Sequence, residues 1–260
     1  MTRRIRLTVE YDGTAYSGWQ RQLNAISVQQ RLEEAVRKLT GEETSVTGAS
    51  RTDAGVHALG QVAHFDTSSR IPRDKFCFAL NTVLPEDIRV CASSETRPDF
   101  HARFDAKGKL YRYLIHNHAH ACAVGRNTHA HAIYPLDEEL MHQEAQAAVG
   151  THDFAAFAAS GSVVKDTVRT IHEARVLRNG SEVEFLVRGD GFLYNMVRIL
   201  AGTLIAVGGG KLEPGAIVRA LESKNRLDLG VTAPAHGLTL MKVYYPDDIP
   251  DDDWLALDIF

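Results

Sequence analysis

Two kinds of apolar spacing follow one another near the start of the chain, and their order constrains the fold most. Apolar and polar residues alternate over 5–9, which predicts a half-buried strand. Apolar residues then recur at helical spacing from Ser27, which forms a capping box with Gln30, to Gly41, a residue that commonly ends helices. The chain therefore begins with a strand followed by a helix.

The rest of the first hundred residues continues this mixture. Val46 and residues 62–65 predict short strands, and a helix is expected over 73–82, before Pro85. The resulting order is strand, helix, strand, strand, helix, strand. We therefore expect an α+β lobe over residues 1–105.

The second half partly repeats the pattern. Its predicted elements are a strand at 109–116, a helix at 137–149, strands at 170–177 and 183–188, an apolar helix at 193–207, a shorter helix from Pro214 and a last strand at 238–243. We expect a second α+β lobe over 106–246 and an acidic tail over 247–260. With no linker between them, the two pseudo-symmetric lobes should share a mostly antiparallel sheet and hold a cleft between them.

Composition narrows the class of protein. The 260 residues are 44% hydrophobic, which suits two lobes with ordinary cores. No apolar run approaches the ~20 residues of a membrane span, and the first residues lead into a strand rather than an apolar signal core. The three cysteines lack metal-pair spacing and are interpreted as reduced. These features predict a soluble, cytoplasmic protein without membrane contact.

Charge gives a weaker indication. The 29 Lys and Arg residues face 33 Asp and Glu residues, which by itself argues mildly against a polyanionic partner. Acidic residues concentrate in 247–258 and 137–139, however, whereas basic residues are frequent in the first half. A basic face for nucleic acid is therefore compatible with the net charge.

Asp53 is the residue whose setting points most clearly to chemistry. It lies between Arg51 and Gly55, in a loop predicted to connect two short strands. Gly55 permits a sharp bend, and a nearby cation such as Arg51 can keep the carboxylate ionised. An Asp before Ala-Gly is often only a turn residue that binds its own backbone. A carboxylate displayed at a strand end is also how a nucleophile or a base is presented.

Five strings, in the same order, resemble the tRNA pseudouridine synthase A (TruA) family. RTDAGVHA, at residues 51–58, matches the signature loop of that family letter for letter, and the one departure nearby is Ser50, where the family usually has Gly. The other four strings are EYDGTAYSGWQRQ (10–22), DFHARFDAKGKLYRY (99–113), GDGFLYNMVRILAGTLIAVG (189–208) and TAPAHGLTLMKVYY (232–245). They extend over nearly the whole chain.

The resemblance implies a pseudouridine synthase fold and the isomerisation of uridine to pseudouridine, which needs no cofactor and no metal. It implies that Asp53 is the nucleophile, that Tyr111 stacks on the extruded uracil, and that Leu238 closes the other side of the pocket. The carboxylate could attack or stabilise the sugar C1′ or accept a sugar proton, and the sequence leaves these roles open.

Arg198 is the predicted ion-pair partner of Asp53. An ionised carboxylate in a poorly hydrated site needs a cation beside it, and Arg198 lies within an otherwise apolar helix. A long side chain reaching water at the helix rim is the alternative interpretation. Arg51 is assigned to contacting RNA or to helping evict the target base.

The resemblance also implies the partners. They are tRNA, modified at uridines 38, 39 and 40 of the anticodon arm, and a second copy of the chain in a homodimer. Scattered Lys and Arg residues would contact phosphates and make binding depend on salt. The main alternative is a non-catalytic RNA-binding module, which would use the tyrosines and basic residues but would not need Asp53 with Arg198.

Three other motifs fail as sites. Alternating histidines over 116–131 suggest metal ligands, but the segment lacks the paired cysteines of a structural site, and a polar RNA-facing insertion is the preferred interpretation. Glycines 208–210 before Lys211 lack the remaining residues of a phosphate loop. An aspartic protease would need two Asp-Thr/Ser-Gly loops, and the sequence contains none.

Overall fold

The computed structural model describes residues 2–159 and 166–246, and their contacts divide them into two compact units. The first unit contains residues 2–107 and 239–246, and the second contains 108–159 and 166–238. The acidic tail predicted for 247–260 lies outside the described residues.

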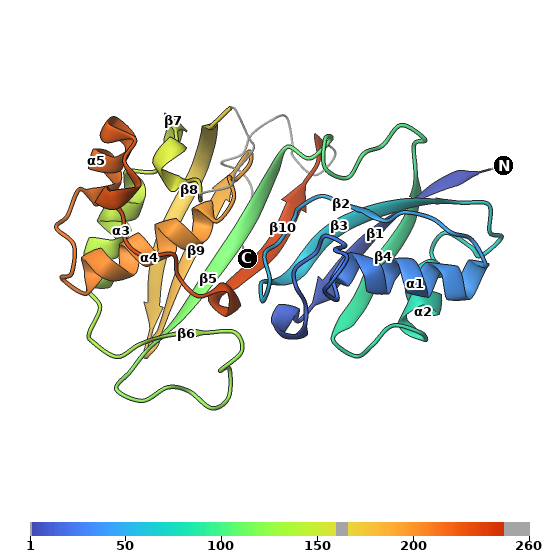
Figure 1. Cartoon of the computed structure of the whole chain (residues 1–260), viewed down its shortest axis with the longest axis horizontal. Coiled ribbons are helices and arrows are strands. Elements are labelled where there is room, and N and C mark those ends of the chain that lie inside the picture. The colour runs from blue at the N-terminus through green and yellow to red at the C-terminus, as the bar shows by residue number, and fades with distance from the viewer. Residues whose placement is uncertain (1, 160–165, 247–260) are drawn as a thin grey trace. The chain divides into compact units, whose positions relative to one another are not determined.

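The first unit is a mostly antiparallel sheet with two helices (Figure 1). Its elements are β1 (Arg3–Tyr11), α1 (Val28–Thr40), β2 (Thr47–Gly48), β3 (His57–Thr67), α2 (Phe76–Asn81), β4 (Ile88–Thr96) and β10 (Leu238–Tyr244), the last belonging to this unit from Thr239 onward. The strand order is β4-β1-β3-β10, with β2 also paired to β3. Only β10 runs parallel to its partner β3, and the other described pairs of this unit are antiparallel.

α1 begins and ends where the sequence predicts, although Ser27 and Gln30 make only one half of the predicted capping box. The Ser27 side chain accepts a hydrogen bond from the backbone N–H of Gln30 at 3.3 Å, and Gly41 ends the helix in the left-handed conformation, with φ at 73°. The Gln30 side chain donates to Glu34. Three apolar residues of the helical pattern are fully buried: Val28, Leu32 and Val36. Local sequence therefore sets the length of α1.

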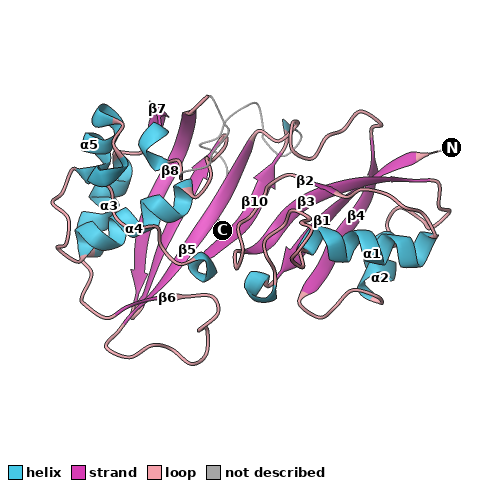
Figure 2. Cartoon of the chain, in the orientation of Figure 1, coloured by secondary structure: helices cyan, strands magenta, loops and turns pink. Residues whose placement is uncertain are grey.

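The second unit has the same two kinds of element (Figure 2). Its elements are β5 (Gly108–Asn117), β6 (Ala130–Ala132), α3 (Glu138–Gln146), β7 (Gly150–Asp153), β8 (Val168–Asn179), β9 (Glu182–Gly189), α4 (Met196–Gly208) and α5 (Ala216–Ser223). The strand order is β5-β9-β8-β7, with antiparallel pairing throughout, and β6 pairs in parallel with β5. Helix α3 packs on β8, and α4 packs on α3.

The predicted α+β class with mostly antiparallel strands is confirmed, and the predicted elements occur in the predicted order. The sequence analysis missed β6 and β7, and several bounds differ. β3 is much longer than the predicted 62–65, because its polar residues also pair with β1. α2 and α4 start about three residues later than predicted, each after a turn, closed by Lys75 N–H to Pro72 O at 2.9 Å and by Met196 N–H to Leu193 O at 3.1 Å.

The assignment of β10 also differs from the predicted boundaries. The sequence pattern put residues 238–243 in the second lobe, whereas contacts place the strand from Thr239 onward with the first unit. The reason is its parallel pairing with β3, in which Thr239 lies opposite His57 and Leu240 opposite Ala58. The shared sheet and the cleft between the lobes stay predictions.

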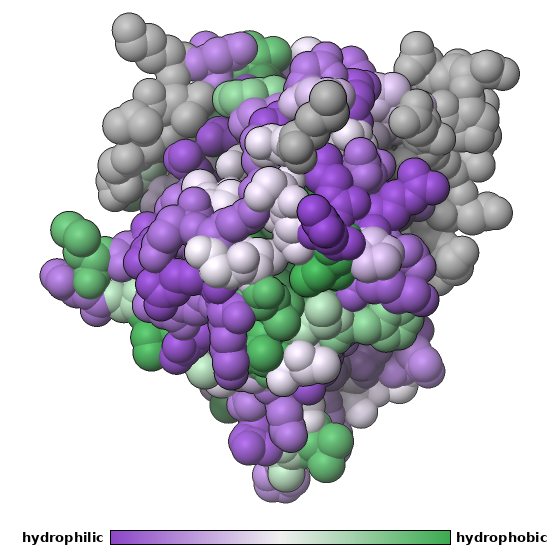
Figure 3. Space-filling model, turned by 90° about the vertical axis from the view of Figure 1, so that its right-hand side faces the viewer, coloured by the Kyte–Doolittle hydropathy of each residue, from purple (hydrophilic) through white to green (hydrophobic). Residues whose placement is uncertain are grey.

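The surface and the helices carry no membrane signature in the described residues. Within 2–159 and 166–246, no helix combines the length and the apolar character that crossing a membrane requires. Figure 3 shows one face of the molecule, on which hydrophobic residues form small patches within a mainly hydrophilic surface.

Candidate active site

Asp53 lies in the loop between β2 and β3. Within that loop, the backbone N–H of Val56 donates to the carbonyl of Asp53 at 3.1 Å, which closes a turn immediately before β3 begins at His57. Gly55 takes φ at 78°, as its predicted role in the bend requires. Asp53 itself is half-buried. Asp53 therefore lies in the loop that leads into β3, as predicted, and the role of its carboxylate stays a prediction.

The loop that follows β1 holds the residues on both sides of Asp53. The backbone N–H of Trp19 donates to the carbonyl of Thr52 at 3.1 Å, and the backbone N–H of Gly55 donates to the carbonyl of Tyr16 at 3.2 Å. The Tyr11 hydroxyl and the Thr52 Oγ1 are hydrogen bonded at 2.7 Å in a buried position. The string at 10–22 and the string at 51–58 thus form one interlocked structure.

Gly18 makes this close approach possible. Its φ is 84°, and a Cβ at this position would lie 2.3 Å from the carbonyl oxygen of Thr52. Any other residue here would therefore have a strained backbone, and its side chain would collide with the Asp53 loop. The sequence analysis did not predict that this loop supports Asp53.

Gln61 is a supporting residue that the sequence analysis missed. Its side chain is fully buried on β3, where it accepts from the backbone N–H of Ser50 at 3.1 Å and donates to the carbonyl of Ser50 at 2.8 Å. The backbone N–H of Ala49 also donates to the carbonyl of Val62 at 2.8 Å. A glutamine directly before the predicted strand at 62–65 was the available signal.

Arg51 is exposed, two residues before Asp53. Partial burial is the main cause that lowers the pKa of Arg103, and the positive charge of Arg51 lowers it further. Arg103 belongs to the string at 99–113, and the sequence analysis counted it only as one of many basic residues. The first unit therefore brings two guanidinium groups together beside the Asp53 loop.

Tyr111 lies on β5 in the second unit, opposite Val187 of β9. Only 7% of it is exposed, and its ring meets that of Phe192 edge to face, with the centroids 5.2 Å apart. Tyr113, two residues on, is fully buried, and its hydroxyl donates to the carbonyl of Pro234 at 2.8 Å. Burial raises the pKa of Tyr113. The two tyrosines share a face of β5, as predicted.

Arg198 is in the first turn of α4, where a cation is disfavoured by the positive end of the helix dipole. Specific contacts hold it in place. Its Nε donates to the carbonyl of Ala233 at 2.8 Å, and its Nη1 donates to Oδ1 of Asn195 at 2.8 Å. The backbone N–H of Ala233 donates to the carbonyl of Arg198 at 3.0 Å. The guanidinium is therefore fixed rather than extended freely into water at the helix rim.

Asn195, which orients Arg198, has unusual backbone geometry. It caps α4 with φ at 61°, one of two non-glycine residues with positive φ among those described. Asparagine tolerates this conformation better than most residues. The sequence analysis missed this role, although an Asn just before an apolar helix was a usable signal.

Leu238 is 6% exposed and begins β10. The residue before it, Gly237, packs so tightly on Tyr113 that a Cβ would lie 2.6 Å from Cζ of that ring. Three strings of the second unit therefore meet: the one with the tyrosines, the one with Arg198 and the closing string at 232–245. The pairing of Asp53 with Arg198, and the enclosure of one base by Tyr111 and Leu238, stay predictions.

The histidine-rich segment at 116–131 begins in the last residues of β5 and reaches β6. His116 lies opposite His131 of β6, with ring centroids 6.2 Å apart, and the ring of His118 is 5.7 Å from that of His116. His129 is bonded through Nε2 to Glu182 at 2.8 Å. In the described part of the chain, no three His, Cys, Asp or Glu side chains are arranged to hold a metal ion.

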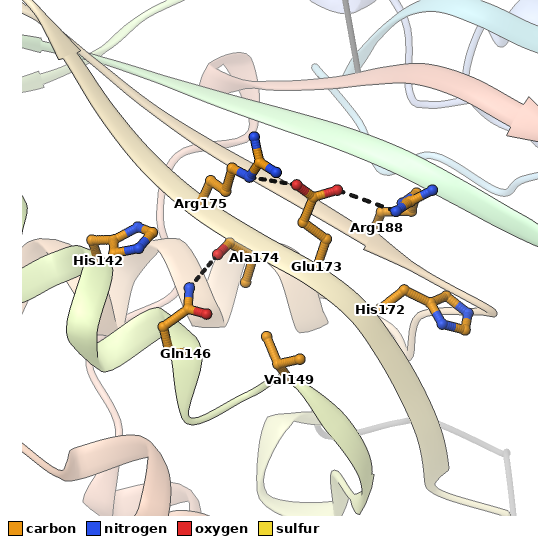
Figure 4. A pocket seen from close by; sticks show the side chains of 8 residues that line it. All are labelled: His142, Gln146, Val149, His172, Glu173, Ala174, Arg175 and Arg188. Atoms are coloured by element: carbon orange, nitrogen blue, oxygen red, sulfur yellow. Dashed lines mark hydrogen bonds and ion pairs between the residues drawn. The ribbon is translucent and has the colours of Figure 1, made fainter. Parts of the chain in front are cut away.

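A pocket in the second unit, shown in Figure 4, opens where β8 extends beyond β7. Its lining consists of His142, Gln146, Val149, His172, Glu173, Ala174, Arg175 and Arg188. Glu173 lies between two cations, 2.5 Å from Arg175 and 3.3 Å from Arg188. Gln146 donates to the carbonyl of Ala174, which satisfies an edge group of β8. The described lining contains none of the five predicted site residues.

Comparison with known proteins identifies the family of this chain. Residues 7–105 and 145–246 match the profile of a family described as tRNA pseudouridine synthase. Proteins named tRNA pseudouridine synthase A are similar over 94% of this chain and 100% of their own length. They include those of Acetivibrio thermocellus (52% identical over 243 residues) and Ruminiclostridium cellulolyticum (52% over 244 residues). Another, from Thermoanaerobacter sp., is 47% identical over 243 residues.

Similarity to solved structures is lower. The structure titled "Crystal Structure of a Cbf5-Nop10-Gar1 Complex" aligns with 91% of this chain and 48% of that chain, with a TM-score of 0.41 and 12% identity. This likeness is too low to support an inference about the site.

Proposed function

The chain belongs to the tRNA pseudouridine synthase family, and we propose that it isomerises uridine to pseudouridine at positions 38, 39 and 40 of the tRNA anticodon stem-loop. It is an isomerase acting on uridine in tRNA. The bond from uracil N1 to the sugar C1′ breaks, the base turns, and a bond from C5 to C1′ forms. C5 loses its hydrogen as a proton and N1 takes up a proton, so product and substrate have the same composition and no second substrate is consumed.

One observation carries the proposal: the backbone of the Asp53 loop is held on both flanks, while residue 53 itself stays partly exposed. Thr52 and Gly55 are bound by the loop after β1, and Ser50 is bound by Gln61. A carboxylate that must meet a sugar carbon needs this fixed position, because small misplacements of a reacting group cost large factors in rate. A residue that only capped its own turn would need none of these supports.

Each predicted residue has a role in the proposed reaction. Asp53 is the nucleophile, and the Arg198 guanidinium pairs with it, so that the carboxylate stays ionised away from bulk water. The fixed guanidinium supports this role, because Ala233 and Asn195 already orient it. Tyr111 supplies a ring for the extruded uracil, Leu238 covers the opposite side, and Arg51 contacts the RNA backbone.

The proposal also covers how the enzyme selects its tRNA substrates, where in the cell it acts and its oligomeric state. We expect binding to depend on RNA shape and phosphates rather than on neighbouring bases, so unrelated tRNAs with a uridine at 38, 39 or 40 should be substrates. We also propose a cytoplasmic homodimer, in which an anticodon arm held by one subunit reaches the active site of the other.

Release of the C5 hydrogen of uracil from unmodified tRNA tests the reaction. Wild-type protein should release it, Asp53→Asn should release none at saturating enzyme while still binding tRNA, and Asp74→Asn, an exposed carboxylate of the same unit, should behave as wild type. Mapping pseudouridine along the tRNA then tests the positions. Modification confined to uridines outside 38–40 would sink the anticodon-arm assignment without touching the chemistry.

The competing RNA-binding module makes a different prediction for the same experiment. A binder would retain tRNA with either residue at position 53, and wild-type protein would release no hydrogen from any tRNA with uridines in the anticodon arm. That result would remove the isomerase assignment for this substrate.

A further inference from the structure

A turn of the first unit, residues 99–105, presents an aromatic ring to solvent. Phe104 is 75% exposed, and its ring stacks on the imidazole of His101, with the centroids 4.2 Å apart and the planes 31° from parallel. Single exposed apolar side chains are common and need no explanation by themselves. The surroundings of Phe104 are what distinguish it.

The turn that carries Phe104 is held by buried contacts. His64 accepts through Nδ1 from the backbone N–H of Ala102 at 3.2 Å, and the Tyr245 hydroxyl donates to the carbonyl of Ala102 at 2.6 Å. The backbone N–H groups of Arg103 and Phe104 donate to Nδ1 of His101 at 3.2 and 3.3 Å. The exposed ring is therefore fixed in orientation, unlike a side chain on a loose loop.

The same turn supplies a cation next to a second one. The Arg103 guanidinium carbon is 6.0 Å from the centroid of Phe104, and Arg103 is exposed. Arg51 of the Asp53 loop carries a second positive charge, which adds to the lowering of the Arg103 pKa. Guanidinium groups attract anions such as phosphate.

We propose that Arg103 contacts a backbone phosphate of the RNA substrate and that Phe104, supported by His101, stacks on an adjacent unpaired base. This inference rests on the proposed function, which supplies RNA as the ligand. It adds Arg103, Phe104 and His101 to the residues that position the substrate.

The chemistry of RNA fits each part of this surface. Guanidinium groups bind phosphate oxygens through paired N–H donors. Unpaired bases in RNA loops stack on aromatic rings without regard to sequence. A ring already fixed by His101 loses little side-chain entropy when a base binds, so the stack should strengthen binding measurably.

The test compares exposed phenylalanines of the same unit. Phe104→Ala should weaken tRNA binding by about 5- to 150-fold, the range observed for loss of one base stack, and Phe104→Tyr should restore most of it. Phe78 is the matched control, because it is 66% exposed and has Nζ of Lys75 5.2 Å from its ring. Phe78→Ala should leave tRNA affinity unchanged. Thermal unfolding of each variant reports whether the fold persists.

Salt dependence separates the phosphate contact from the stack. The slope of log affinity against log salt should become shallower by roughly 0.7 in Arg103→Gln, as expected for loss of one phosphate contact on single-stranded RNA. Phe104→Ala should lower affinity at every salt concentration without changing the slope. Lys75→Gln, which removes the cation beside the control ring, should change neither quantity.

Binding is the readout, so this inference and the proposed function can fail separately. Wild-type protein without hydrogen release would remove the isomerase assignment, while weaker binding by Phe104→Ala would still support the surface. Unchanged tRNA affinity in Phe104→Ala, in a folded protein, would overturn the inference even if turnover were normal. If that variant instead lost its dimer with tRNA affinity intact, the surface would belong to a protein contact, and the inference would be overturned as well.

Discussion

The buried side chain of Gln61 pairs with both backbone polar groups of Ser50, at 3.1 Å to the N–H and 2.8 Å to the carbonyl. These two hydrogen bonds take the place of the backbone hydrogen bonds that a paired residue of a neighbouring strand would make. They fix the chain three residues before Asp53.

Gln61→Leu should therefore be costly. Leucine has a similar volume but leaves the N–H and carbonyl of Ser50 buried without their partner, and we expect a loss of about 2–4 kcal/mol in unfolding free energy. The kcat on tRNA should also fall, because the Asp53 loop loses a support. Urea denaturation measures the first effect. Gln22→Leu, which removes an exposed bond to Ser17, should cost little, and equal effects of the two changes would contradict the prediction.

Gly18→Ala tests the contact between the two loops of the first unit. Alanine at φ 84° is strained, and its Cβ would meet the carbonyl oxygen of Thr52 at 2.3 Å. Gly41→Ala is the matched control, since Gly41 has φ of 73° with no atom within 4 Å of the added Cβ. We expect about 1–2 kcal/mol of strain for Gly41→Ala and a larger loss for Gly18→Ala.

Only the Gly18 variant should also lower kcat, because only that change displaces the Asp53 loop. Unfolding by urea and turnover on the same preparations give the two readouts. Identical stability losses in the two variants would mean that backbone strain, and not the collision with Thr52, explains the glycine.

Asn195→Gly isolates the orientation of Arg198. Glycine adopts φ near 61° freely, so stability should change little, whereas Arg198 loses the Oδ1 acceptor of Asn195. We expect kcat to fall by about tenfold, or ~1.4 kcal/mol of barrier, with KM nearly constant. Lys224→Gly, at the other described non-glycine residue with positive φ, should leave kcat alone. A change in KM without a change in kcat would argue against a positioning role.

Stability should depend on pH through His64. Burial chiefly, and then the charges of Arg4 and His101, lowers the pKa of His64 to about 4, whereas an unfolded histidine titrates near ~6.5. Between these values the unfolded chain binds a proton that the folded protein resists. The contribution is therefore full above pH ~6.5 and is lost as the pH falls towards 4.

His64→Asn should flatten this dependence, because asparagine offers an acceptor to the N–H of Ala102 but does not titrate in this range. Urea midpoints at pH 7, 5.5 and 4.5 measure the effect, and His120→Asn, at an exposed histidine, should keep the wild-type slope. Parallel pH profiles of wild type and His64→Asn would remove His64 as the cause.

Much of the fold could be predicted because its signals are local. Ser27 and Gly41 bound α1 through contacts within a few residues, and Gly55 bends the Asp53 loop by its own backbone freedom. The bounds of β3 could not be predicted, because its polar residues interrupt the alternation of apolar and polar residues. Its full length follows from pairing with β1, from Arg3 opposite Thr67 to Tyr11 opposite Ala58.

The candidate site likewise has features that the sequence predicted and features that only the folded structure shows. The sequence by itself determined most of the order of elements, because local spacing carries that information, and it marked Asp53 and Arg198 by residue type and setting, whereas Tyr111 was marked by the resemblance to a known family. Only the tertiary structure decided that Gln61 holds Ser50 and that Ala233 holds Arg198, since hydrogen bonds between distant residues exist only once packing and strand register bring them together. The approach of Arg51 to Arg103 has the same origin: the charges are visible in the sequence, but their distance is a property of the folded chain.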